Sequence, residues 1–92
     1  MLLVPASVAL AHPGQHDQLQ QVNRHLEQTP TDQDLYIQRG IIYSEGGQYD
    51  AALADLLQAQ TLGEAVLVAF QLGVLHYRTG DFEVARDYLQ QY

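Results

Sequence analysis

Residues 40–59 read GIIYSEGGQYDAALADLLQA, and residues 73–92 read GVLHYRTGDFEVARDYLQQY. When the second stretch is aligned on the first so that Gly73 falls on Gly40, small, aromatic and leucine residues fall at matching places. We call this displacement the repeat shift. The matching positions are Gly40, Tyr43, Gly47, Tyr49, Ala52, Leu56 and Ala59 in the first copy, and Gly73, His76, Gly80, Phe82, Ala85, Leu89 and Tyr92 in the second. The repeat shift is about 33 residues, and a fixed period of that size indicates a repeat architecture.

The glycines of the two copies have mechanical reasons to be where they are. Gly40 and Gly73 are expected where the two helices of a unit cross closely, because a side chain there would push the helices apart. Gly47 and Gly80 are expected in the turn between those helices, where glycine adopts a positive φ at little cost. Each copy therefore predicts one helix-turn-helix unit.

Apolar residues at helical spacing between chain breakers predict five helices and no strand. The expected helices cover residues 16–28, a segment from the capping pair Thr31 and Asp34 to about Glu45, residues 49–60, residues 65–79, and a last segment from about Asp81. Because the turns between them are very short, neighbouring helices should be antiparallel.

This organisation resembles the tetratricopeptide repeat, a unit of about 34 residues made of two antiparallel helices. Tyr36 falls where the family carries a large aromatic residue, and Pro30 falls at its boundary proline. The resemblance implies an all-α, TPR-like α-solenoid of antiparallel helix-turn-helix repeats. Its units are residues 33–64 and a truncated 65–92, preceded by residues 16–30 as the leading helix of an incomplete repeat. The sequence departs from the family pattern at Arg39, Glu64, Ala69 and His76.

The resemblance also implies a binding groove, because the first helix of each unit lines a concave surface in this family. The implied groove residues are Asp34, Ile37, Ile41 and Ser44 in the first unit, and Leu67, Phe70, Val74, Tyr77 and the neighbouring Arg78 in the second. For Ile41 and Val74, packing on a neighbouring helix is an equal alternative. The groove lacks the basic and asparagine pattern that binds a C-terminal carboxylate in some members, so an apolar helix or an extended peptide is the expected ligand. Acids such as Asp55 and Asp87 are expected on the opposite, solvated face, where substitution should matter little.

The composition narrows the classes of function. The 92 residues include four arginines, no lysine, eleven acids and no cysteine, with a formal net charge of −7. Nucleic acid is not an expected partner, because phosphate binding needs clustered basic residues. Thiolate metal sites and disulfides are excluded. His76 is interpreted as a packing residue, no serine lies beside a histidine and an acid, and Gly46-Gly47 is a helix break. We therefore expect neither an enzyme nor a cofactor.

The first residues have the pattern of an export signal. Residues 1–11 read MLLVPASVALA, an apolar run with a small-x-small ending that is typical of signal peptide cleavage, although no basic residue precedes Arg24. The run is too short to span a bilayer, which takes about 20 residues. An apolar helix packed on the domain is the alternative, which Pro5 and the polar switch at His12 disfavour. Residues 12–15 would then be a linker, and the protein would be periplasmic or secreted.

Three functional hypotheses follow from the sequence. The first is an exported adaptor that binds a protein or peptide in the groove. The second is a structural protein whose repeats self-associate, since the final stripe of Ala85, Leu89 and Tyr92 has nothing to cover it. The third is a metal handler that uses His12 and His16 after cleavage of the leader.

Overall fold

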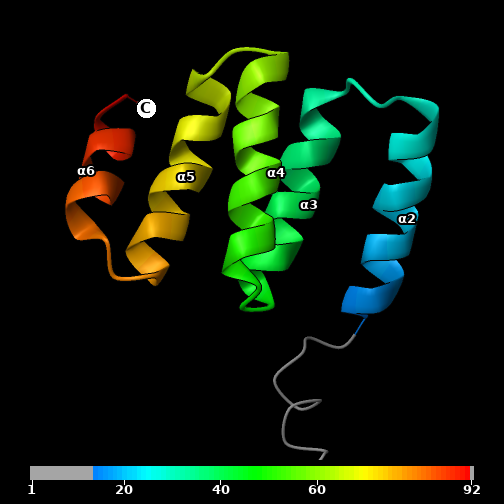
Figure 1. Cartoon of the computed structure of the whole chain (residues 1–92), viewed down its shortest axis with the longest axis horizontal. Coiled ribbons are helices and arrows are strands. Elements are labelled where there is room, and N and C mark those ends of the chain that lie inside the picture. The colour runs from blue at the N-terminus through cyan, green and yellow to red at the C-terminus, as the bar shows by residue number, and fades with distance from the viewer. Residues whose placement is uncertain (1–13, 92) are drawn as a thin grey trace, which may run out of the picture.

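A computed structural model describes residues 14–91. The expected leader, most of the linker with His12, and Tyr92 lie outside the described residues. The described part consists of five helices: α2 (Gln15–Gln28), α3 (Gln33–Glu45), α4 (Tyr49–Leu62), α5 (Val66–Arg78) and α6 (Phe82–Gln91). They stand side by side in chain order, each antiparallel to the next, and no strand occurs among them (Figure 1). The predicted all-α repeat fold is confirmed.

The two hairpins α3–α4 and α5–α6 are built on the same turn. After α3, the N–H of Gly47 donates to the Ser44 carbonyl at 3.1 Å, and that of Gln48 donates to the Tyr43 carbonyl at 2.8 Å. After α5, Gly80 and Asp81 repeat both hydrogen bonds at the same distances and at the positions given by the repeat shift. This pair of bonds is the Schellman motif, which requires a left-handed residue. Gly47 and Gly80 supply it with φ of 80° and 89°.

The two hairpins also share a close helix crossing. A Cβ atom on Gly40 would lie 2.9 Å from the Leu56 side chain, and one on Gly73 would lie 2.7 Å from the Leu89 side chain. Both distances are shorter than carbon atoms tolerate, so glycine is needed for α3 to approach α4 and for α5 to approach α6. The reason given for these two glycines from sequence is thereby confirmed.

The start of α3 differs from the predicted capping pair by one residue. Asp32, not Thr31, is the N-cap, and its carboxylate accepts a hydrogen bond of 2.9 Å from the N–H of Asp34. An aspartate satisfies the unpaired N–H groups of the first turn as well as threonine does, and it also interacts favourably with the helix dipole. Asp32 offers both advantages at this position.

The hydrophobic core lies between hairpins as well as within them. The main cluster joins α4 to α5 and consists of Ala52, Leu56, Ala59, Val68, Leu72 and Leu75. A smaller cluster of Val22, Leu26 and Leu35 joins α2 to α3. Each helical layer thus buries its apolar side on the next layer, as in other solenoids. None of the helices in residues 14–91 combines the length and the hydropathy needed to cross a membrane.

Candidate functional site

The residues predicted for the groove lie on α3 and α5, but the two helices expose them differently. On α3, Asp34 is exposed, Ile37 and Ile41 are half-buried, and Ser44 is buried. Ile37 packs against the main core cluster, which includes residues of α5. On α3, most of the predicted face is therefore at least half-buried.

On α5 the corresponding side chains reach the surface. Leu67, Phe70 and Tyr77 are large and exposed, while Val74 is half-buried. The contrast is greatest at one pair of positions related by the repeat shift, because Ser44 is 7% exposed and Tyr77 is 64% exposed. The predicted face is thus an apolar surface mainly on α5.

Arg78 links the two predicted faces. Its Nη1 donates a hydrogen bond of 2.7 Å to Ser44 Oγ, across the boundary between the hairpins. With Glu45 and Tyr49 these two residues line a hollow of about 470 Å³ at the ends of α3 and α5. A guanidinium has five N–H donors, so Arg78 can still offer hydrogen bonds to a ligand carboxylate while it holds Ser44.

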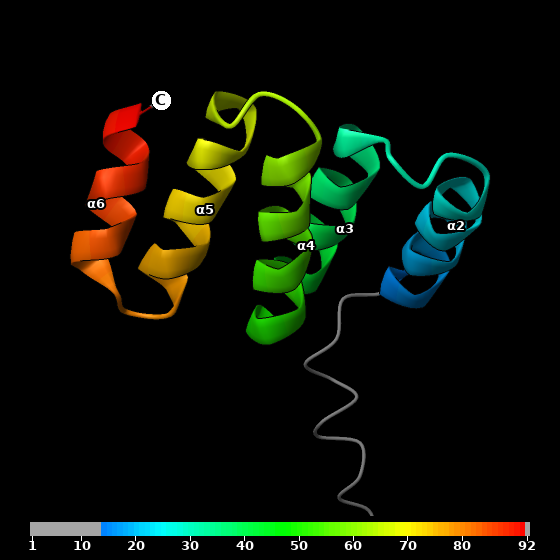
Figure 2. The ribbon, with the colours of Figure 1, turned by 45° about the horizontal axis from the view of Figure 1, so that its top comes forward.

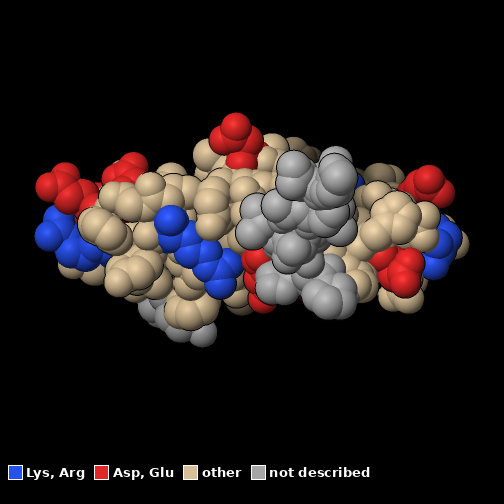
Figure 3. Space-filling model, turned by 90° about the horizontal axis from the view of Figure 1, so that it is seen from below, with Lys and Arg blue, Asp and Glu red and all other residues tan. Residues whose placement is uncertain are grey.

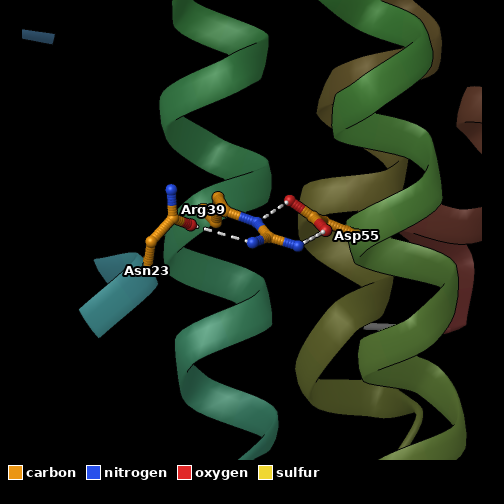
Figure 4. A network of polar contacts seen from close by, with 3 residues as sticks. All are labelled: Asn23, Arg39 and Asp55. Atoms are coloured by element: carbon orange, nitrogen blue, oxygen red, sulfur yellow. Dashed lines mark hydrogen bonds and ion pairs between the residues drawn. The ribbon is translucent and has the colours of Figure 1, made fainter. Parts of the chain in front are cut away.

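A polar network that the sequence analysis missed crosses three helices. Arg39 on α3 donates from Nε and Nη2 to the two carboxylate oxygens of Asp55 on α4, each at 2.8 Å, and from Nη1 to Asn23 Oδ1 on α2 at 2.9 Å (Figure 4). The guanidinium also lies 5.5 Å from the centre of the Tyr36 ring. Because both hydrogen bonds to Asp55 use the planar fork of the guanidinium, the pair is bidentate, the strongest arrangement for such ions.

The expectation that Asp55 is a solvated acid is wrong. Its exposed fraction is 6%, and its charge is compensated by Arg39. The side-chain hydrogen bond to Asp55 raises the pKa of Arg39 above its ordinary value, against the opposing effect of burial. A base with a raised pKa stabilises the fold at every pH below the pKa of its unfolded form, so this contribution is complete at neutral pH. Asp87, in contrast, is exposed as expected.

His76 takes the packing role that the sequence analysis gave it. Its ring stacks on that of Tyr88, with 5.6 Å between centroids and 12° between planes. His16 lies exposed on α2. Among residues 14–91, no three histidine, cysteine or acidic side chains are grouped so as to hold a metal ion. On the face of the molecule seen in Figure 3, the arginines lie apart from one another and gather into no basic patch.

Comparison with known proteins identifies the repeat. Residues 25–54 match the family described as Tetratricopeptide repeat, a segment that contains the last turn of α2, all of α3 and the start of α4. No curated protein and no solved structure matches the chain. The second hairpin reproduces the turn and the crossing of the first at the positions given by the repeat shift. Residues 25–54 therefore form a tetratricopeptide repeat, and repeats of this family are generally modules for protein–protein interaction.

Proposed function

We propose that this protein binds a protein or peptide along the first helices of its repeats. The binding surface consists mainly of Leu67, Phe70, Val74, Tyr77 and Arg78 on α5, beside Asp34, Ile37 and Ile41 on α3. Ser44, the fourth predicted residue on α3, is buried and contributes by holding Arg78. The role needs no chemistry of its own, and it agrees with the general function of the family.

The observation that carries the proposal is the exposed apolar face of α5. Leu67, Phe70 and Tyr77 lie on one side of the helix, and all three are exposed although each is large and apolar or aromatic. Exposed apolar surface that gathers on one face is typical of interaction sites. Aromatic residues anchor such sites because they bury a large area at a small loss of conformational entropy.

The same surface limits the chemistry of the ligand. The apolar face of α5 fits an apolar helix or an extended segment, and Arg78 at its end fits an acidic group of that ligand. Apart from Arg78 the surface carries no basic side chain, so the apolar contacts must supply most of the affinity.

The test is selection of binding peptides from a displayed library of short random sequences, followed by affinity measurement with the enriched peptides. Phe70→Ala combined with Tyr77→Ala should weaken binding by several kcal/mol, since each such anchor contributes about 2 kcal/mol. The matched control is Leu57→Ala, which removes an exposed apolar side chain from α4. It should leave the affinity unchanged.

Circular dichroism checks that the double variant keeps its helix content. A folded double variant that binds the enriched peptides as tightly as the wild type would show that the surface is elsewhere. Equal weakening by Leu57→Ala would move the site from α5 to α4.

Export is a separate part of the proposal, and it rests on residues 1–11 alone. Their apolar run and small-x-small ending favour cleavage after Ala11. Fusion of these residues, with an added basic start, to a reporter enzyme that is active only after export should give activity. Reporter protein retained in the cytosol with the leader intact would contradict it.

A further inference from the structure

α3 and α5 run in the same direction, from top to bottom in Figures 1 and 2, and each consists of 13 residues. A hydrogen bond joins them at either end. Where they begin, Gln33 Nε2 donates to the carbonyl of Glu64, just before α5, at 3.0 Å. Where they finish, Arg78 Nη1 donates to Ser44 Oγ at 2.7 Å. The proposed binding surface on these two helices therefore has an N-terminal end and a C-terminal end.

The two ends of the surface carry different charges. At the N-terminal end, Asp34 and Glu64 are both exposed. At the C-terminal end, Arg78 lines the hollow of about 470 Å³ together with Glu45. The N-terminal end thus has two negative charges, whereas the C-terminal end has one charge of each sign. A ligand gains from a basic residue at the first end and can place an acidic residue only at the second.

The network around Arg39 shows how such an arginine takes a carboxylate. Arg39 gives Nη1 to a neutral acceptor, Asn23 Oδ1, and pairs Nε and Nη2 with the two oxygens of Asp55. Arg78 repeats the first half of this arrangement, because its Nη1 is held by the hydroxyl oxygen of the buried Ser44. Nε and Nη2, the same side of the planar fork, are the atoms that fit a ligand carboxylate.

The surface between the two ends favours a helical ligand. Its side chains are almost entirely apolar or aromatic: Ile37, Ile41, Leu67, Phe70, Val74 and Tyr77. An extended segment lying on them would bury backbone N–H and C=O groups without partners, whereas a helix pairs its own. Asp34 and Ser44 lie about 15 Å apart along the axis of α3, a length that a ligand helix spans in about ten residues.

We infer that the ligand of this surface is an amphipathic helix of a partner protein, with an acidic and a basic residue about ten residues apart. The acidic residue pairs with Nε and Nη2 of Arg78, and the basic residue lies beside Asp34 and Glu64. The inference rests on the function proposed above and adds the form and the charge pattern of the ligand. These charges fix its orientation, because a reversed helix would bring its acid to Asp34 and Glu64.

The test selects ligands from a displayed library on an alanine-rich helical framework of about 18 residues, since shorter isolated helices are marginal in water. The positions of one face and of both ends are randomised. Selection on the wild-type protein should enrich peptides with an acidic and a basic residue about ten residues apart. Replacing the acidic residue of an enriched peptide by glutamine should weaken binding about threefold, as expected for an exposed ion pair.

Variants of the protein show whether Arg78 is the partner of that acid. Arg78→Gln should bind the acidic peptide and its glutamine version equally, which closes a double-mutant cycle. Glu45→Gln removes the opposing charge from the hollow and should increase the preference for the acidic peptide. The matched control is Arg24→Gln, the same change at an exposed position on α2, which should keep the threefold preference. Circular dichroism checks that each variant is folded.

An unchanged preference for the acidic peptide in folded Arg78→Gln would overturn the inference, as would its loss in Arg24→Gln. Enrichment from the random library described above but not from the helical one would also overturn it, in favour of an extended ligand. These results leave the proposed function standing, which fails if Phe70→Ala with Tyr77→Ala binds the enriched peptides as the wild type does. A dimer in sedimentation velocity that this double variant dissociates would assign the surface to a second copy and overturn the inference.

Discussion

Two three-helix junctions of the molecule are related by the repeat shift, and they are held together by different chemistry. Where α2, α3 and α4 meet, the side chains are Asn23, Arg39 and Asp55, joined by hydrogen bonds and an ion pair. Where α4, α5 and α6 meet, the equivalent side chains are Leu56, Leu72 and Tyr88, the first two buried in the main core and the third packed against it.

The turn and the close helix crossing of the two hairpins are alike in spite of this difference. The turns that follow α3 and α5 have the same hydrogen bonds, and the crossings at Gly40 and Gly73 are both too close for a Cβ atom. What fixes the unit is therefore its glycines and its turn. The centre of the junction can be filled either by a bidentate ion pair or by apolar side chains, provided that every buried polar atom is paired.

The largest effect is expected from breaking the polar junction. Asp55→Ala leaves the partly buried guanidinium of Arg39 without its counter-charge, and losing one partner of such a pair costs on the order of 3 kcal/mol. Urea denaturation should show the loss as a lower midpoint. Asp87→Ala, at an exposed site on α6, is the control and should change the free energy of unfolding by less than about 0.5 kcal/mol. Equal stability of the two variants would mean that Arg39 and Asp55 do not pair in solution.

The comparison of the junctions also shows what the sequence could predict. The period, the turn glycines and the crossing glycines are local or periodic features, so five helices and their pairing could be expected from them. The pairing of Arg39 with Asp55 depends on how α4 is rotated against α3, which no local pattern records. A signal was nevertheless present, because both residues stand where the second copy has an apolar or aromatic residue.

The prediction of the groove from the sequence was incomplete for the same reason, because it depends on how the helices pack. The spacing on α3 and α5 identified one face of each helix, but not that α5 would cover part of the face on α3. That cover makes Ser44 a buried acceptor for Arg78 while Tyr77 stays exposed. Packing between units makes equivalent positions of the two copies differ in exposure. A sequence repeat by itself cannot show which of those positions a neighbouring helix covers.

A smaller effect is expected at the edge of the polar junction. Asn23→Ala removes one hydrogen bond to Arg39 and leaves the ion pair intact, so it should cost about 1 kcal/mol. Asn23→Asp is the matched variant, since it keeps an acceptor at the same place and adds a charge opposite to that of Arg39. Its stability should equal or exceed that of the wild type at low salt, with the difference shrinking as salt is added. A cost as large as that of Asp55→Ala would show that α2 is held mainly through Asn23 and not through the small cluster of Val22, Leu26 and Leu35.

The smallest net effect is expected from exchanging one junction for the other. The triple variant Asn23→Leu, Arg39→Leu and Asp55→Tyr gives the first junction the side chains of the second. Replacing a buried ion pair by packed apolar side chains is often neutral or stabilising, because the desolvation cost of both charges disappears. We therefore expect a free energy of unfolding within about 1 kcal/mol of the wild type, although Asp55→Ala alone is strongly destabilising. The measurement is urea denaturation of the wild type, the triple variant and each single variant under one set of conditions. If the triple variant is as unstable as Asp55→Ala, the two junctions are not interchangeable, and the first one needs its ion pair to hold α3 against α4.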